Sequence, residues 1–260
     1  MTSDEVIERL ASIDTHQNDI KRKLHSQEAI QRLAFEHRRP RCYPEFRSQY
    51  GEDMLAWAML DYATSGTYVE VGGFDGKTYS VTFALDAIGW EGVLIEAIPE
   101  MYAESLSNRQ YATNIHSAVG PRGCKVTTVF TVVQGGGMFS GAEGSHDINP
   151  GLAAATKPKK QIEVPCSDMD SLLYRRWPRG TQLDLAVIDV EGAELDVLDG
   201  IDFNIWRPRV VIIEDNTFGK DHRMDRYFAK DYQLYGQLAC NRVYGRKDDP
   251  QVWRFMNPTC

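Results

Sequence analysis

Residues 68–80 read YVEVGGFDGKTYS, and the interpretation of the whole chain starts from this stretch. A short apolar run ends on the carboxylate of Glu70, and glycines follow at positions 72, 73 and 76. Because glycine has no β carbon, a turn built from it lets the main chain approach a bound molecule closely. The stretch therefore indicates a strand that leads into a ligand-binding turn.

Helix-like and strand-like patterns alternate along the rest of the chain. Helical apolar spacing predicts helices at 51–62, 80–89, 99–109 and 193–198. Apolar runs predict strands at 68–71, 92–96, 114–119, 126–133, 183–190 and 210–214, with two more within 232–246. This alternation predicts an α/β fold, in which a mostly parallel sheet carries helices on both faces and a closing hairpin adds an antiparallel edge.

The glycine turn favours one class of nucleotide ligand over another. A nicotinamide or flavin site needs GxGxxG, whereas here two adjacent glycines are followed by phenylalanine. The carboxylates of Glu70 and Asp75 would also repel a pyrophosphate. S-adenosylmethionine suits them better, since it carries an ammonium and a sulfonium group and no phosphate. Glu96 ends the next strand, where an acid can accept both ribose hydroxyls; the competing interpretation is a structural turn with a solvated Glu96.

Several stretches together resemble the FkbM family of S-adenosylmethionine-dependent O-methyltransferases. They are SQYGEDML, YVEVGGFDGKTYSVTFAL, GWEGVLIEAIPEMY, LAVIDVEGAELDVLDGIDF and VVIIEDN, in the family's order. The resemblance covers roughly residues 46–246. It implies a class I methyltransferase fold and methylation of a hydroxyl, often on a sugar or a polyketide-type product. The chain departs from the family in its first motif, where Gly72, Gly73 and Phe74 stand in place of Gly-Ala-Asn.

The resemblance also implies roles for residues outside the turn. Gln49 and Ser80 would hold the amino-acid end of the cofactor, and Ser117 would lie near its adenine; a surface glutamine and a helix-capping serine are the competing interpretations. The expected cofactor site consists of Gln49, Glu70, Gly72, Gly73, Asp75, Gly76, Ser80, Glu96, Ala97 and Ser117.

Acidic residues end the next two predicted strands. An alcohol is a poor nucleophile until its proton leaves, so an O-methyltransferase needs a positioned base or a divalent cation. Asp189 ends one strand, and Glu214 with Asp215 ends the next. Carboxylate oxygens suit Mg²⁺ or Mn²⁺, so these three residues are the expected metal ligands. The alternative is that one acid binds the substrate and the others cap helices.

Further candidates for the proton transfer lie nearby in the sequence. Asp189 and Glu191 are expected catalytic residues, whereas Glu194 is assigned a structural role in the first turn of a helix. Among the histidines we favour His222 as general base over His146, which lies beside a glycine-rich loop at 134–145. That loop would either fold over the acceptor or form a mobile hairpin.

Residues 1–40 are expected to form a separate helical segment before a methyltransferase domain at 41–260. Val6, Ile13 and Ile20 recur every seven residues, and Leu10 and Leu24 lie on the neighbouring seam positions. This spacing favours a short coiled coil that would build a homo-oligomer. The alternatives are an amphipathic helix packed on its own domain and a frayed tail.

Composition limits the remaining possibilities. The chain of 260 residues has a net charge of −8, which argues against a nucleic-acid surface. Its five cysteines are widely spaced without a CxxC pair, which favours reduced thiols and a cytoplasmic location. No apolar run approaches the ~18 residues of a membrane span.

The sequence therefore predicts a cytoplasmic S-adenosylmethionine-dependent O-methyltransferase that acts on a sugar hydroxyl of a glycan or glycosylated metabolite, with Mg²⁺ or Mn²⁺. One alternative is methylation of a non-sugar small molecule. Another is a non-catalytic oligomeric scaffold with a degenerate cofactor fold.

Overall fold

The computed structural model describes the backbone of residues 3–133, 141–142, 159–220 and 222–258, with side chains from residue 17 onward except at 141–142. Its centre is a seven-stranded sheet with the order β10-β11-β9-β8-β1-β2-β3. The strands are β1 (Thr67–Val71), β2 (Glu91–Glu96), β3 (Thr113–His116), β8 (Leu185–Ile188), β9 (Val210–Glu214), β10 (Tyr232–Leu238) and β11 (Asn241–Arg246). All pairings are parallel except those of β11, which runs antiparallel to β9 and β10.

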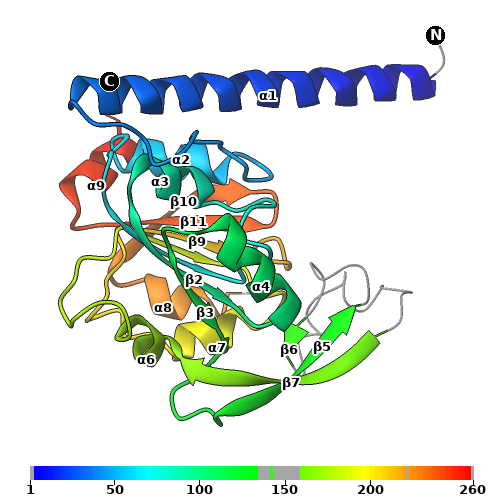
Figure 1. Ribbon diagram of the computed structural model, residues 1–260, viewed down its shortest axis with the longest axis vertical. Coiled ribbons are helices and arrows are strands. Elements are labelled where there is room, and N and C mark those ends of the chain that lie inside the picture. The colour runs from blue at the N-terminus through cyan, green and yellow to red at the C-terminus, as the bar shows by residue number, and fades with distance from the viewer. Residues whose placement is uncertain (1–2, 134–140, 143–158, 221, 259–260) are drawn as a thin grey trace.

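This topology has one switch point. From β1 the chain proceeds outward through β2 to β3, and it later returns to the other side of β1 with β8 and then β9. Ligands of open α/β sheets bind outside the carboxyl ends of the strands at such a point. The seven-stranded order with a single antiparallel strand confirms the predicted class I methyltransferase architecture (Figure 1).

Helices cover both faces of the sheet, because the central strands bury side chains on both sides. Val69 and Val71 of β1 lie in one core with residues of α6, α7 and α8, while Tyr68 lies in the other with residues of α1, α2, α3 and α9. The helices are α1 (Ser3–Phe35), α2 (Glu52–Met59), α3 (Phe83–Ile88), α4 (Pro99–Asn108), α6 (Met169–Leu173), α7 (Glu194–Asp199), α8 (Asp225–Phe228) and α9 (Pro250–Met256).

A second sheet of four strands lies beside the first (Figure 1). It has the order β4-β7-β5-β6, with β4 (Ala118–Gly120), β5 (Thr127–Val133), β6 (Gly141–Ala142) and β7 (Lys159–Asp168). The prediction of one strand at 114–119 was wrong in this respect, since the chain divides into β3 and β4 at Ser117. The Ser117 N–H donates to the carbonyl of Glu96, and the chain then leaves the large sheet to pair with β7.

The N-terminal segment is one long helix, α1, that crosses one side of the domain (Figure 1). Near its end Ala29 and Leu33 are fully buried in the core that also contains Trp57. Ile20 and Leu24, both on the heptad seam, are 59% and 57% exposed. The end of the helix thus packs on its own domain, while Ile20 and Leu24 are exposed before it. Within the described residues, no helix has the length and apolarity to cross a membrane.

Candidate functional site

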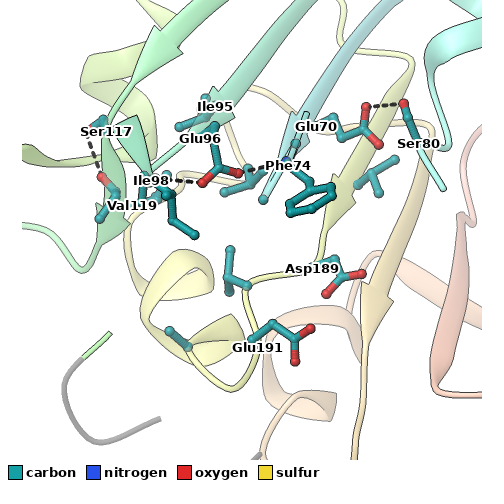
Figure 2. Close-up of a pocket in the computed structure, with 18 of the residues that line it drawn as sticks. Glu70, Phe74, Ser80, Ile95, Glu96, Ile98, Ser117, Val119, Asp189 and Glu191 are labelled. Atoms are coloured by element: carbon teal, nitrogen blue, oxygen red, sulfur yellow. Dashed lines mark hydrogen bonds between the residues drawn. The ribbon is translucent and has the colours of Figure 1, made fainter. Parts of the chain in front are cut away.

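A pocket opens at the carboxyl ends of β1, β2 and β8, at the switch point of the large sheet (Figure 2). Seven of the ten residues expected to bind the cofactor line it. They are Glu70, Gly72, Gly73, Ser80, Glu96, Ala97 and Ser117. Asp189 and Glu191 line the opposite wall of the same pocket. The pocket therefore contains most of the residues expected to bind the cofactor and two of those expected to take part in the chemistry.

Glu70 is 4% exposed and is held by three donors close in sequence. The hydroxyl of Ser80 donates to its Oε2 at 2.8 Å, and the hydroxyl of Thr82 donates to the same oxygen at 2.6 Å. Oε1 accepts the main-chain N–H of Val81 at 3.0 Å. These three hydrogen bonds fix the orientation of the Glu70 carboxylate at the pocket wall.

Glu96 closes β2 as expected, and both of its oxygens accept main-chain N–H groups. Oε2 accepts from Phe74 and Oε1 from Ile98, each at 2.7 Å. The side chain is 6% exposed, and burial raises its pKa to about 7 despite these bonds. The bond to Phe74 ties the glycine turn to the end of β2.

The two adjacent glycines are required by close packing. Gly72 has φ +80°, and a β carbon there would overlap the main-chain carbonyl oxygen of Asp189. A β carbon at Gly73 would come within 2.5 Å of the Leu94 side chain. Both positions thus let the turn lie between β8 and β2 while its main chain faces the pocket.

Phe74, which the sequence left without a role, is a pocket residue. Its φ of +49° lies in the left-handed region, where a bulky side chain is unusual. Its ring projects into the pocket between Glu96 and Asp189 (Figure 2). An aromatic side chain thus lines the pocket at the position where the family pattern has asparagine. The only sequence signal was the departure from the family pattern itself.

Three expected cofactor residues lie elsewhere. Asp75 caps the turn by accepting the N–H groups of Lys77 and Thr78, and it does not line the pocket. Gly76 packs against α4, since a β carbon there would come within 2.7 Å of Arg109. Gln49 is exposed and does not line the pocket either. In this structure, Asp75 and Gly76 shape the turn and Gln49 lies apart from it.

Three carboxylates converge at the ends of β8 and β9. Oxygens of Asp189, Glu191 and Glu214 all lie within 4.8 Å of one another. Glu214 is 6% exposed, and its buried Oε2 receives no hydrogen bond from the described residues. Burial, together with the charges of Asp189 and Glu191, raises the pKa of Glu214 well above its usual range. The cluster therefore needs protons or a cation to be stable.

Glu191 takes the place expected for Asp215 in this cluster. Asp215 follows Glu214 directly and its side chain is turned away, into a buried ion pair with Arg242 at 2.7 Å. It also accepts the N–H groups of Thr217 and Gly219. Consecutive residues of an extended chain point to opposite sides, so Glu214 and Asp215 cannot both face one ligand. The expected ligand set is corrected accordingly.

The histidine favoured as general base lies outside the pocket. The His222 side chain is 78% exposed and its Nδ1 contacts Asp225 Oδ2 at 3.0 Å. It is not among the pocket residues, so the structure gives it no access to an acceptor there. His146 and most of the 134–145 loop lie outside the described residues. Glu194 accepts the N–H groups of Val190 and Gly192, in keeping with its structural assignment.

The topology and the pocket at its switch point define a methyltransferase of class I architecture. Residues 70–237 match the model of the methyltransferase FkbM domain, and the chain belongs to this family of S-adenosylmethionine-dependent methyltransferases. No curated protein matches the chain. Among solved structures, a TehB-like SAM-dependent methyltransferase from Corynebacterium glutamicum aligns at 12% identity with a TM-score of 0.38, over 86% of this chain and 100% of that one.

Proposed function

We propose that this chain transfers a methyl group from S-adenosylmethionine to a hydroxyl, that the acceptor is a sugar of a glycan or glycosylated metabolite, and that a divalent cation assists. The observation that supports this most is the cluster of Asp189, Glu191 and Glu214, of which Asp189 and Glu191 line the wall opposite the cofactor residues. Methylation of a non-sugar small molecule is the competing assignment, since hydroxyls of either kind would meet the same acids.

The cofactor side of the pocket fits the polarity of S-adenosylmethionine. In our proposal the carboxylate of Glu70 faces the ammonium group, and Glu96 accepts the ribose hydroxyls. Ionised Glu96 is the better acceptor, and hydroxyl donors would lower its pKa from about 7. Ser117 and Ala97, on the side of β4, would border the adenine.

The acidic cluster would activate the acceptor. The hydroxyl proton passes to Asp189 or Glu191 as the oxygen attacks the methyl carbon, and the C–S bond breaks to leave neutral S-adenosylhomocysteine. Oxygen donors are the ligands that Mg²⁺ and Mn²⁺ prefer, and a bound cation would lower the pKa of the hydroxyl. The buried Oε2 of Glu214, which lacks a donor in the described residues, fits such an ion.

A single experiment tests the reaction. The protein is incubated with labelled S-adenosylmethionine and a panel of sugars, glycan fragments and hydroxylated small molecules, with and without EDTA. We expect transfer to a carbohydrate that EDTA abolishes and Mg²⁺ restores. Full activity in EDTA would exclude a role for a divalent cation in the reaction. Methyl transfer to small molecules alone would favour the competing assignment.

A variant separates chemistry from binding in the same assay. Asp189→Asn should lower kcat by roughly 10²–10⁴-fold and leave cofactor binding intact, because it removes a proton acceptor and ligand without changing the shape of the site. Calorimetry that detects no S-adenosylmethionine binding to the unmodified protein would instead support a non-catalytic scaffold.

A further inference from the structure

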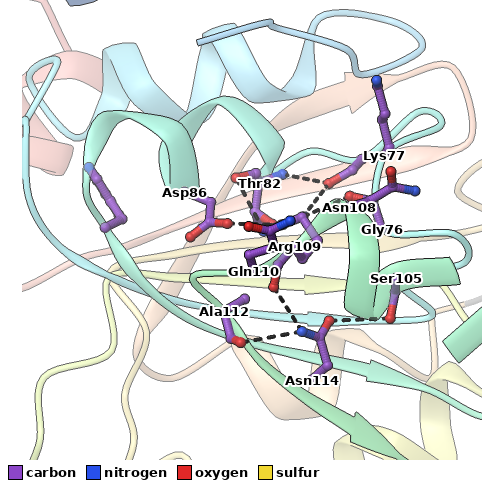
Figure 3. Close-up of polar contacts among 12 residues, drawn as sticks. Gly76, Lys77, Thr82, Asp86, Ser105, Asn108, Arg109, Gln110, Ala112 and Asn114 are labelled. Carbon is purple, nitrogen blue, oxygen red and sulfur yellow. Dashed lines mark hydrogen bonds and ion pairs between the residues drawn. The ribbon is translucent and has the colours of Figure 1, made fainter. Parts of the chain in front are cut away.

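Arg109, at the end of α4, is fully buried and contacts the glycine turn at Gly76 (Figure 3). An arginine with no exposed surface is rare, because its charge must be compensated by the protein. Here one guanidinium contacts several separate parts of the turn and its flanks. They are Tyr68, Glu70, Gly76, Ser80, Thr82 and Asp86. The arginine thus connects β1, the turn and the start of α3.

The distances show how Arg109 acts on Glu70. Its direct contact with the Glu70 carboxylate is long, at 3.4 Å. Its shorter bonds go to hydroxyl oxygens, at 3.0 Å to Ser80 and 2.8 Å to Thr82. A hydroxyl that accepts from a guanidinium, which can only donate, is free to direct its own proton elsewhere. Both hydroxyls direct it to Glu70 Oε2, at 2.8 and 2.6 Å.

Because Arg109 acts through the hydroxyls of Ser80 and Thr82, the two carboxylate oxygens of Glu70 have different hydrogen-bond partners. Oε2 accepts from Ser80, from Thr82 and, at the longer distance of 3.4 Å, from Arg109, whereas within the described residues Oε1 accepts one hydrogen bond, from the Val81 N–H at 3.0 Å. An oxygen of a carboxylate has about two acceptor positions, so Oε1 retains capacity for a ligand in the pocket. The hydroxyl proton of Ser80 is already engaged, which makes Ser80 a support for Glu70 instead of a direct donor to the cofactor.

Asp86 anchors the other edge of the guanidinium. Its Oδ2 accepts from Arg109 Nε at 3.3 Å, and its Oδ1 pairs with Arg41 at 3.3 Å. The Arg41 side chain thus offsets the second buried carboxylate, and Arg109 is held with its Nη atoms toward Ser80 and Thr82. Arg109 Nη1, the nitrogen that donates to Ser80, also donates to the main-chain carbonyl of Gly76 at 3.2 Å.

We propose that Arg109 is a positioning residue of the cofactor site: it orients the hydroxyls of Ser80 and Thr82 toward Glu70 and so fixes the carboxylate that receives the ammonium group of the cofactor. This rests on the proposed role of Glu70. It assigns Arg109 a specific effect on the amino-acid end of the ligand, and none on the adenosine end, which lies toward Glu96 and Ser117.

Two ligands that differ only in the end concerned provide the test. S-adenosylhomocysteine carries the amino-acid end, whereas 5′-methylthioadenosine lacks it. For Arg109→Lys, which keeps the charge and loses the planar fork, we expect the Kd of S-adenosylhomocysteine measured by calorimetry to rise by roughly 10- to 100-fold. The Kd of 5′-methylthioadenosine should change by less than about twofold. A parallel loss of both ligands, or no loss of either, would overturn the proposal.

A second variant tests the same positioning role if Arg109→Lys does not fold. Thr82→Val removes one hydroxyl of the relay at nearly constant volume, and we expect a smaller loss of the same selectivity. Thr64→Val is the matched control, since Thr64 likewise accepts from an arginine, Arg38, and donates to a glutamate, Glu36, far from the pocket. Equal effects of the two threonine variants would contradict the proposal. Failure of the unmodified protein to bind either ligand would instead count against the proposed function.

Discussion

The main-chain carbonyl oxygen of Asp189 occupies the space that a β carbon of Gly72 would need. The Asp189 N–H also donates to the carbonyl of Val71 at 3.0 Å, so a hydrogen bond joins the ends of β1 and β8 beside this contact. The glycine turn and Asp189, the first residue of the acidic cluster, are thus in direct contact. A substitution at Gly72 should therefore alter both the glycine turn and the position of Asp189.

Gly72→Ala should destabilise the fold by about 2 kcal/mol or more and weaken cofactor binding, because it adds a steric overlap to an unfavourable φ of +80°. Gly123→Ala separates the two effects. Gly123 has φ +75° with nothing within 4 Å of its β position, so it should cost only about 1 kcal/mol. Urea unfolding and calorimetry measure both variants; equal losses of stability would show that the contact with Asp189 contributes nothing.

The pKa of Glu96 gives the stability a definite dependence on pH. The group ionises at about pH 7 in the folded chain, against a reference value of 4.5, so the unfolded chain releases its proton first. Its contribution is full below about pH 4.5 and is lost as the pH rises through 7, by up to about 3 kcal/mol.

Glu96→Gln should therefore reduce the fall in unfolding free energy between pH 5 and pH 8. Part of the fall should remain, because burial raises the pKa of Glu214 in the same direction. Urea titrations at the two pH values measure the difference. An unchanged pH dependence in the variant would mean that Glu96 is ionised throughout this range.

The corrected ligand set can be tested by comparing two acidic residues. Glu191→Gln should weaken activation by Mg²⁺ at least about tenfold, since it removes one carboxylate from the cluster, and should leave stability within about 0.5 kcal/mol. Asp215→Asn should do the opposite: it removes the buried carboxylate partner of Arg242, which keeps its ion pair with the more exposed Asp225, at a cost of roughly 3 kcal/mol. Magnesium titrations of activity and thermal unfolding measure the two effects. Loss of magnesium activation in the Asp215 variant at full stability would restore the original assignment.

The exposed seam of α1 predicts self-association. Ile20→Glu, at a position that is 59% exposed, should convert a homo-oligomer to a monomer in light-scattering measurements, because a charge on the seam opposes helix pairing. Asn18→Glu, an exposed polar position on the same helix, is the control and should have no effect. A monomeric unmodified chain would leave only the packing of Ala29 and Leu33 as the role of this helix.

Local sequence determined the strands, the turn and the acids at the strand ends. The apolar run 210–214 forms a strand that is buried along its whole length, as its composition predicts. Parallel strands then bring their carboxyl ends to one edge of the sheet. For that reason Glu70, Glu96 and Asp189 could be placed around one pocket, and Glu214 close to Asp189, before the fold was known.

Tertiary structure decided which neighbouring groups complete the site. The opposite directions of Glu214 and Asp215, the return of Glu191 toward the pocket through a left-handed φ of +57°, and the burial of Arg109 depend on how separate segments pack. An arginine at a helix end has no local pattern that distinguishes it from a solvated one. Only the convergence of β1, α3 and α4 surrounds it with oxygen acceptors, and this convergence is a property of the folded chain.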